Sequence, residues 1–174
     1  MLTTKRITGS ESPWFAEVDA LYETAFPLHE KREPDSKVSV LENDRYNLLA
    51  WLDGEQFVGM TGSWDFDGYS YIEHFAVNSA LRSQGYGKRV LGEFLQRQPL
   101  TILEIDPLTS DIAHKRLRFY QSLGFRQNGY PHFHPSYHQG IDDHALIVLS
   151  YPQAIDDVQY QHFNQHLGQV VMAK

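Results

Sequence analysis

Alternating and continuous runs of hydrophobic residues predict seven strands along the chain. The expected strands are Leu2–Ile7, Tyr46–Leu52, Phe57–Trp64, Tyr69–Val77, Thr101–Ile105, Phe125–Asn128 and Ala145–Ser150. Asp53-Gly54 and Asp67-Gly68 separate the second, third and fourth of these segments. Asp-Gly is typical of tight hairpin turns because glycine accepts a positive φ without strain. These three segments are therefore expected to be antiparallel neighbours.

Helical spacing of the hydrophobic residues predicts the remaining elements. The expected helices are Pro13–Phe26, Asp35–Glu42, Gly85–Arg97, Ser110–Leu123 and, in the tail, Pro152–Gly168, with Ile155, Val158, Phe163 and Leu167 as its hydrophobic positions. In the helix 110–123, Ile112, Phe119 and Leu123 form the expected apolar stripe, and Arg116 falls among these positions. A buried guanidinium needs a carboxylate or carbonyl partner.

The order of elements is strand, helices, antiparallel strands, helix, strand, helix and strands. This order predicts an α/β fold with a mixed sheet rather than a wholly parallel one. The chain of 174 residues contains no internal repeat, low-complexity tract or Ser/Gly linker. We therefore expect a single domain over residues 1–174, with a core of about residues 2–150 and a C-terminal extension of about residues 151–174.

Composition narrows the class of protein. Hydrophobic residues make up 41% and charged residues 21% of the chain, as in ordinary globular proteins. The longest strongly apolar run, Ala145–Leu149, is too short to cross a membrane, and the N-terminus lacks a signal-peptide-like stretch. There is no cysteine, and the net charge is −7. These features predict a cytoplasmic protein without disulfides and disfavour binding to a membrane or to nucleic acid.

The segment between the strand 69–77 and the helix 85–97 carries the clearest chemical signal. It contains Arg82-x-x-Gly85-x-Gly87, a glycine-containing turn at the start of a helix. Free backbone N–H groups and the helix dipole make such a turn a site for an anion. It is not a nucleotide P-loop, because Arg89 stands where that motif has a hydroxyl. It is not a dinucleotide fingerprint either, because Val90 replaces the third glycine.

Two motifs together resemble the GNAT superfamily of N-acetyltransferases. Arg82-x-x-Gly85-x-Gly87 is similar to the acyl-CoA pyrophosphate loop of that superfamily. Thirty-three residues beyond Gly87, Tyr120-x-x-Leu123-Gly124-Phe125 resembles its Tyr-x-x-Leu-Gly-Phe signature. The resemblance covers roughly residues 2–150. It implies a mostly antiparallel central sheet flanked by helices on both faces.

The resemblance implies acetyl-CoA as the co-substrate. The pyrophosphate would bind the turn, and the pantetheine arm would follow the backbone of Phe75–Val77. The implied cofactor-binding residues are Phe75, Ala76, Val77, Arg82, Ser83, Gln84, Gly85, Tyr86, Gly87 and Lys88. Many members have Asn and Ala where this chain has Ala113 and Arg116. We therefore expect Arg116 to pair with a strand carboxylate, with Glu73 and Glu104 as the candidates.

Two residues are the candidates for catalysis. Tyr120 stands at the family's tyrosine position, where it would donate a proton to the thiolate; the alternative is that it only packs against the cofactor. Glu73, in an apolar strand, is either the general base, directly or through water, or the ion-pair partner of Arg116. Strand alternation places His74 on the opposite face from Glu73, as a hydrogen-bonded structural histidine.

A histidine-rich loop precedes the last strand. His132-x-His134-x3-His138 offers three nitrogen donors within seven residues, a spacing that metal sites use. The first two of these histidines lie between Pro131 and Pro135, in an expected loop before the final strand, and we expect no metal there. Tyr130, Phe133, Tyr137 and some of these histidines are instead expected to line the acceptor pocket, with surface or packing roles as the alternative.

The sequence thus predicts an N-acetyltransferase in which a primary amine attacks acetyl-CoA directly in a ternary complex. A small acceptor is favoured, and acidic loop residues favour a cationic one: Glu30, Glu33, Asp35, Asp65 and Asp67. A peptide acceptor is the second option. The alternative function is a CoA-binding sensor or interaction module without turnover. Homodimers are common in the resembling family, so the resemblance allows one here.

Overall fold

The computed structural model describes residues 1–173. Contacts within the chain group into two compact units, Met1–Pro99 and Leu100–Lys174. The first unit contains β1 (Thr3–Ile7), α1 (Phe15–Ala25), α2 (Pro34–Ser39), β2 (Tyr46–Asp53), β3 (Gln56–Phe66), β4 (Tyr69–Val77) and α3 (Tyr86–Gln96). Its short 3-10 turns are η1 (Leu28–Glu30), η2 (Val40–Glu42) and η3 (Ser79–Leu81).

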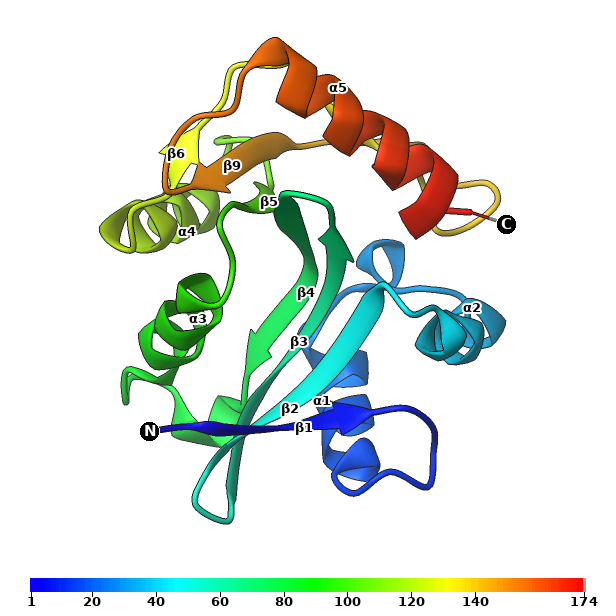
Figure 1. Cartoon of the computed structure of the whole chain (residues 1–174), viewed down its shortest axis with the longest axis vertical. Helices are drawn as coiled ribbons and strands as arrows, with labels where there is room; N and C mark the ends of the chain where they lie inside the picture. Colours follow the sequence, from blue (N-terminus) through cyan, green and yellow to red (C-terminus); the bar gives the residue numbers. More distant parts are fainter. Residues whose placement is uncertain (174) are drawn as a thin grey trace. The chain divides into compact units, whose positions relative to one another are not determined.

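The first unit is built on four antiparallel strands in the order β1-β2-β3-β4. The two Asp-Gly turns join β2 to β3 and β3 to β4 as predicted, with φ of 62° at Gly54 and 86° at Gly68. Helices α1 and α2 cover one face of these strands and α3 covers the other (Figure 1). Both faces are therefore shielded, which explains why β3 and β4 are buried along most of their length.

A β-bulge interrupts the pairing of β3 with β4. Gly62 pairs with His74 and Ser63 pairs with Ile72, so Glu73 is the extra residue of the bulged strand. A bulge turns successive side chains away from strict alternation. Glu73 contacts Arg32, and the ring of His74 packs against Tyr22 of α1, so both side chains reach the face that α1 covers. The prediction that His74 faces away from Glu73 is wrong for this reason.

The second unit contains its own antiparallel strands. Its elements are β5 (Thr101–Ile105), α4 (Asp111–Ser122), β6 (Arg126–Gln127), β7 (Phe133–His134), β8 (His144–Ala145), β9 (Ile147–Tyr151), α5 (Asp157–His166) and the π-helical turn η4 (Leu167–Val171). Strand β9 lies between β5 and β6, and β7 pairs with β8 as a separate ribbon. Ser110 caps α4 by accepting a hydrogen bond from the Ala113 N–H.

Helix α4 is rotated relative to the face that we expected it to bury. Ala113 and Leu117 are its buried residues, whereas Ile112 is 65% exposed. The prediction of Ile112 as a core position is wrong, because the buried line starts one residue later. The same rotation leaves Arg116 on the surface. Its guanidinium therefore does not need the buried partner that we predicted.

The C-terminal segment packs as part of the second unit. Asp156 and Gln159 form a reciprocal capping box that begins α5. Tyr160, Phe163 and Leu167 are buried. Val158 is 63% exposed, so the prediction of Val158 as a hydrophobic core position is wrong. The residues after β9 thus supply hydrophobic core.

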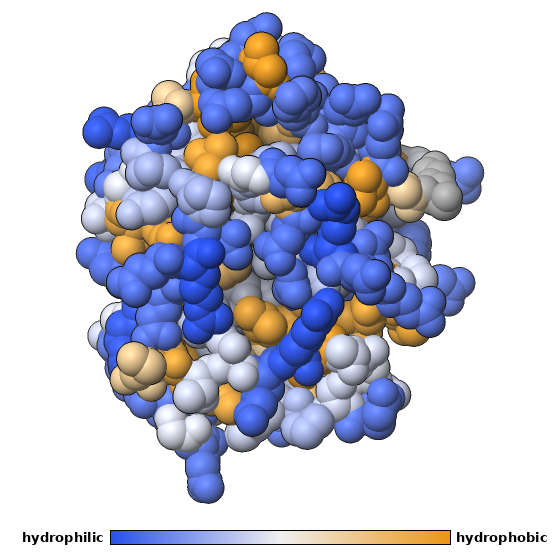
Figure 2. Space-filling view, in the orientation of Figure 1, coloured by the Kyte–Doolittle hydropathy of each residue, from blue (hydrophilic) through white to orange (hydrophobic). Residues whose placement is uncertain are grey.

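The structure confirms a mixed α/β fold with mostly antiparallel strands and flanking helices. The face drawn in Figure 2 is mainly hydrophilic, with hydrophobic residues in small separate patches. None of the helices within residues 1–173 is long and apolar enough to span a membrane.

Candidate active site

The turn before α3 has the backbone geometry of an anion site. Gly85 is the N-cap of the helix and adopts φ 79°, ψ 10°, a left-handed conformation that favours glycine. Ser83, two residues earlier, also has a positive φ of 66°. Positive φ at a non-glycine residue is uncommon and is often found at functional sites. Residues 82–85 are exposed, so the first N–H groups of α3 are open to a ligand.

Two contacts between α3 and the end of β2 hold this turn in place. The Tyr86 hydroxyl donates a 2.7 Å hydrogen bond to Asp53 Oδ2, and Arg89 Nη1 lies 3.3 Å from the same oxygen. The hydrogen bond from Tyr86 and the charge of Arg89 lower the pKa of Asp53. Arg89 is therefore already paired. Within the first unit, neither Arg82 nor Lys88 has an ion pair, so both cations are available beside the turn.

The strand that leads into the turn ends at the predicted pantetheine-binding residues. Phe75, Ala76 and Val77 pair with Thr61, Met60 and Gly59 of β3. Asn78 then turns the chain: its side chain accepts a hydrogen bond from Ala80 and donates one to Phe57. The cofactor residues predicted in the first unit are thus contiguous, running from the end of β4 through η3 into α3.

Glu73 is held in a buried hydrogen-bonded ion pair. Its side chain is 0% exposed, and Oε1 lies 3.0 Å from Arg32 Nη2 and 2.8 Å from Trp64 Nε1. Burial alone would raise the pKa of Glu73, but the charge of Arg32, the electrostatic interaction with His74 and the hydrogen bonds from Arg32 and Trp64 lower it to about 2. Glu73 is therefore ionised at neutral pH and is a weak base.

The predicted pairing of Glu73 with Arg116 is wrong, because each residue has another partner. Glu73 pairs with Arg32, and Arg116 Nη1 lies 3.6 Å from Asp106 Oδ2, just after β5. The Arg116–Asp106 pair is exposed on both sides, so it contributes little stability. Arg32 was missed by sequence analysis, because it comes from an irregular segment 41 residues before Glu73 and no periodicity links the two.

His74 is a structural histidine, as predicted. Its Nε2 donates to the backbone carbonyl of Glu30 at 2.7 Å, and its ring packs edge-on against Tyr22 and Phe26. It thereby fixes the segment after α1 against β4.

Tyr120 lies near the end of α4, packed against the rings of Phe119 and Phe125. Burial raises the pKa of Tyr120 to about 12, and the charge of Arg116 only partly offsets this shift. The phenol is therefore protonated at neutral pH. Within the second unit no hydrogen-bond acceptor is found for its hydroxyl. Tyr120 thus has a proton that it can donate to a ligand.

Glu104 forms a second buried polar cluster, which sequence analysis did not foresee. Its Oε2 lies 2.6 Å from His132 Nε2, and His132 Nδ1 lies 2.8 Å from the Tyr160 hydroxyl. A carboxylate only accepts, so Nε2 carries the hydrogen. The Tyr160 hydroxyl bridges His132 Nδ1 and the carbonyl of Pro131, to which it donates at 3.3 Å. The prediction of Glu104 as a partner of Arg116 is therefore wrong. The available signal in the sequence was a carboxylate within an apolar strand, because such a group needs a partner when it is buried.

The three loop histidines do not behave alike. His132 and His134 are buried, and His134 Nδ1 donates to Pro135 O at 2.7 Å, whereas His138 is half-buried. Within residues 1–173, no group of three or more His, Cys, Asp or Glu side chains is arranged to hold a metal ion. The lining of an acceptor pocket by this loop stays a prediction.

Comparisons with known proteins agree with this architecture. The model of the Acetyltransferase (GNAT) family matches residues 14–125. A putative GNAT acetyltransferase from Bacteroides thetaiotaomicron is 26% identical, with 99% of both chains covered and a TM-score of 0.92. A Bacillus subtilis acetyltransferase solved with CoA is 16% identical over 88% of this chain and 100% of that chain, with a TM-score of 0.59.

An aminoglycoside acetyltransferase from an uncultured soil metagenomic sample is 18% identical over 76% of this chain and 93% of that chain, with a TM-score of 0.54. No curated protein matches the sequence. Because the family model covers more than half of its residues, the chain belongs to the GNAT acetyltransferase family and is an acyltransferase.

Proposed function

We propose that this chain transfers the acetyl group of acetyl-CoA to a primary amine of a small acceptor. The observation that carries the proposal is the exposed turn at Gly85, with left-handed backbone at the N-terminus of α3, in a member of the GNAT family. The N–H groups of such a turn suit a diphosphate. The CoA bound in the Bacillus subtilis neighbour supports the same class of co-substrate.

The backbone N–H groups of Gln84–Lys88 would bind the pyrophosphate. Arg82 and Lys88, which have no ion pair within the first unit, would add charge-assisted contacts. The backbone of Phe75–Val77 would hold the pantetheine arm and meet the oxyanion of the tetrahedral intermediate. In this scheme the enzyme positions the thioester before the amine arrives.

The reaction then needs three proton transfers. The acceptor ammonium loses one proton to solvent, and the neutral amine attacks the thioester carbonyl, so that a C–N bond forms in the tetrahedral intermediate. Collapse of the intermediate then breaks the C–S bond. Tyr120 donates its proton to the leaving thiolate and recovers one from the attacking nitrogen. Its pKa of about 12 supports this role, because the proton is present at neutral pH. The products are the N-acetyl amide, CoA and one released proton.

Glu73 acts in this proposal as the buried partner of Arg32, which balances its charge and holds the segment before α2 against β4. Its pKa of about 2 makes it inefficient as a direct base, so proton removal passes through water. The acidic balance of the chain favours a cationic acceptor. The aminoglycoside acetyltransferase among the neighbours supports a small acceptor. A cytoplasmic location stays a prediction of the sequence.

Turnover separates an enzyme from a CoA-binding module. We expect free CoA to be released from acetyl-CoA with at least one member of a panel of polyamines, aminoglycosides, amino acids and peptides. The Tyr120→Phe variant should lose roughly 100-fold in kcat, because it cannot donate a proton, while its affinity for acetyl-CoA stays unchanged. Unchanged kcat would remove Tyr120 from the chemistry. Acetyl-CoA binding without turnover on any amine would favour the module.

A further inference from the structure

The exposed turn before α3 contains two residues with left-handed backbone, Ser83 with φ 66° and Gly85 with φ 79°. This conformation costs free energy at a residue with a side chain, so it persists only where the surrounding structure holds it. Among the residues that the structure describes, the side chains of 82–84 make no hydrogen bond or ion pair. The support therefore comes from the segments on either side of the turn.

On the N-terminal side, Asn78 ties the chain to β3. Its side chain donates a hydrogen bond to the carbonyl of Phe57 at 3.0 Å and accepts one from the Ala80 N–H at 3.1 Å. Leu81, at the end of η3, is buried beside it in sequence. These contacts fix where the turn begins, and the position of its other end depends on α3.

On the C-terminal side, Asp53 at the end of β2 holds two side chains of α3. Tyr86, the first residue of the helix, is 8% exposed, and its hydroxyl donates to Asp53 Oδ2 at 2.7 Å; Gln56 Oε1 is farther away, at 3.5 Å. Arg89 Nη1 lies 3.3 Å from the same Asp53 oxygen, and the guanidinium lies over the Tyr86 ring, 5.0 Å from its centroid. Residues three positions apart share one face of a helix, so a single carboxylate fixes the rotation of the helix start.

This rotation matters because the first turn of α3 carries the free N–H groups that a diphosphate would use. Those groups point out of the N-terminal end of the helix, so a shift or rotation of the first turn changes where they point. Hydrogen bonds weaken steeply when their distance and angle depart from the optimum. The contact that holds the helix start therefore also determines how well the turn binds an anion.

We propose that Asp53 is a positioning residue for acetyl-CoA. Through Tyr86 and Arg89 it sets the direction of the N–H groups at the start of α3, without contacting the cofactor itself. Asp53 lies outside the motif that predicts the turn, 33 residues before Tyr86. The inference rests on the proposed function, because it takes the turn to be the diphosphate site.

Charge and position predict opposite effects of removing this carboxylate. If only charge mattered, loss of Asp53 would free Arg89 and strengthen the binding of an anion. If Asp53 positions the helix, loss of the acceptor lets Tyr86 and the helix start move, and binding weakens. Weaker binding without Asp53 therefore reports its positioning role.

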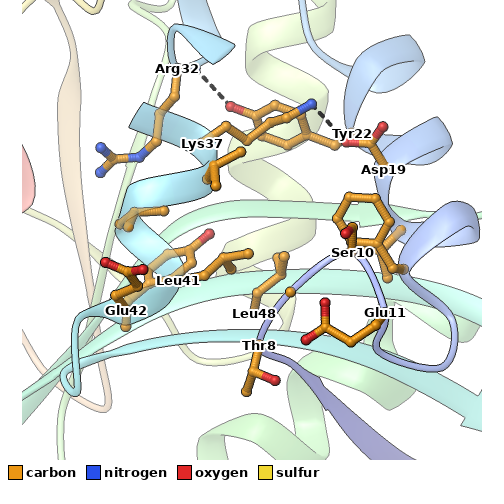
Figure 3. Close-up of a pocket in the computed structure, with 16 residues that line it drawn as sticks. Thr8, Ser10, Glu11, Asp19, Tyr22, Arg32, Lys37, Leu41, Glu42 and Leu48 are labelled. Atoms are coloured by element: carbon orange, nitrogen blue, oxygen red, sulfur yellow. Dashed lines mark hydrogen bonds and ion pairs between the residues drawn. The ribbon is translucent and has the colours of Figure 1, made fainter. Parts of the chain in front are cut away.

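The first unit also contains a cavity of about 330 Å³, on the face of the strands that α1 and α2 cover (Figure 3). Asp53, Tyr86 and Arg89 are not among its lining residues. Substitution at Asp53 or Tyr86 leaves the walls of this cavity in place. A change in acetyl-CoA affinity in these variants therefore reports on the turn.

The test is calorimetric titration of acetyl-CoA at a temperature where chemical denaturation shows every variant to be folded. We expect Asp53→Ala and Tyr86→Phe to bind at least about fivefold more weakly than wild type. Asp53→Asn keeps an oxygen that accepts from Tyr86, so it should bind more tightly than wild type or within about twofold of it. Glu55→Ala removes an exposed carboxylate from the same β2–β3 turn and is the matched control, with affinity within about twofold of wild type.

Wild-type affinity in Asp53→Ala or Tyr86→Phe would overturn the inference, even if these variants were less stable, because a purely structural role lowers only the free energy of unfolding. Equal weakening in Asp53→Ala and in Asp53→Asn or Glu55→Ala would overturn it too. The Arg82→Ala/Gly85→Glu variant separates the two proposals. If it binds as wild type does, the turn is not the diphosphate site and both proposals fail. If it loses binding while Asp53→Ala and Tyr86→Phe keep theirs, only the positioning role fails.

Discussion

The Glu73 side chain is fully buried, and the guanidinium of Arg32 is its main charge partner. Removing one member of such a pair leaves an uncompensated charge in the interior, which typically costs about 3–5 kcal/mol. The pair also joins the segment between α1 and α2 to β4. One contact therefore fixes both the ionisation of Glu73 and the position of the segment that carries Arg32.

The stability that this pair supplies depends on pH. The pKa of Glu73 is lowered from its ordinary 4.5 to about 2, so the contribution is complete above about pH 4.5 and is lost as the pH falls towards 2. We expect Glu73→Gln to be less stable than wild type by about 3 kcal/mol near neutral pH. Urea unfolding between about pH 6 and pH 3 should show the two stabilities converging. Parallel curves would contradict the ion-pair account.

The start of α3 is the element on which the proposed cofactor binding depends. Gly85 has a φ of 79°, and a Cβ there would meet no atom within 4 Å, so substitution is limited by backbone strain and not by space. We expect Gly85→Ala to lower the free energy of unfolding by about 1–2 kcal/mol and to weaken acetyl-CoA binding.

Gly92 in the same helix is the matched control. It also has open space around it, but its φ is not positive, so Gly92→Ala should stabilise the protein by about 0.5–1 kcal/mol. Chemical denaturation measures both variants. Equal effects of the two alanines would mean that the left-handed turn is not required.

Helix α5 is held to its unit by a polar contact as well as by hydrophobic packing. Its Tyr160 hydroxyl is 2.8 Å from His132 Nδ1. We expect Tyr160→Phe to destabilise the protein by about 1–3 kcal/mol, because it leaves a buried nitrogen without its hydrogen bond. Val158→Ala, at an exposed position of the same helix, should change the stability by less than about 0.5 kcal/mol. Similar losses in both variants would contradict a role for this hydrogen bond.

At the scale of elements, the sequence correctly predicted strand bounds and turns, because these depend on residues that are close together in the chain. The strands 69–77 and 101–105 have the predicted bounds, and the two Asp-Gly turns form the predicted hairpins. The bulge at Glu73 and the rotation of α4 depend on packing with distant segments, so alternation and helical spacing alone gave the wrong faces for His74 and Ile112.

At the scale of the candidate site, the contiguous residues were predictable and the distant pairs were not. The turn at residues 82–88 follows from one motif. The pairs Arg32–Glu73 and Glu104–His132 join residues 41 and 28 positions apart. No single-sequence pattern specifies such pairs. The cavity between α1, α2 and β2 likewise arises only when these elements pack.

For the whole molecule, family membership and the turn before α3 converge on one claim: the backbone of Gln84–Lys88 binds the diphosphate of acetyl-CoA. The most direct measurement is calorimetric titration of acetyl-CoA into wild type and into the Arg82→Ala/Gly85→Glu variant. We expect one acetyl-CoA per wild-type chain and at least about tenfold weaker binding in the variant, which loses a cation and gains a carboxylate at the turn. Equal affinity in the two proteins, or no binding heat from wild type at millimolar acetyl-CoA, would contradict the claim.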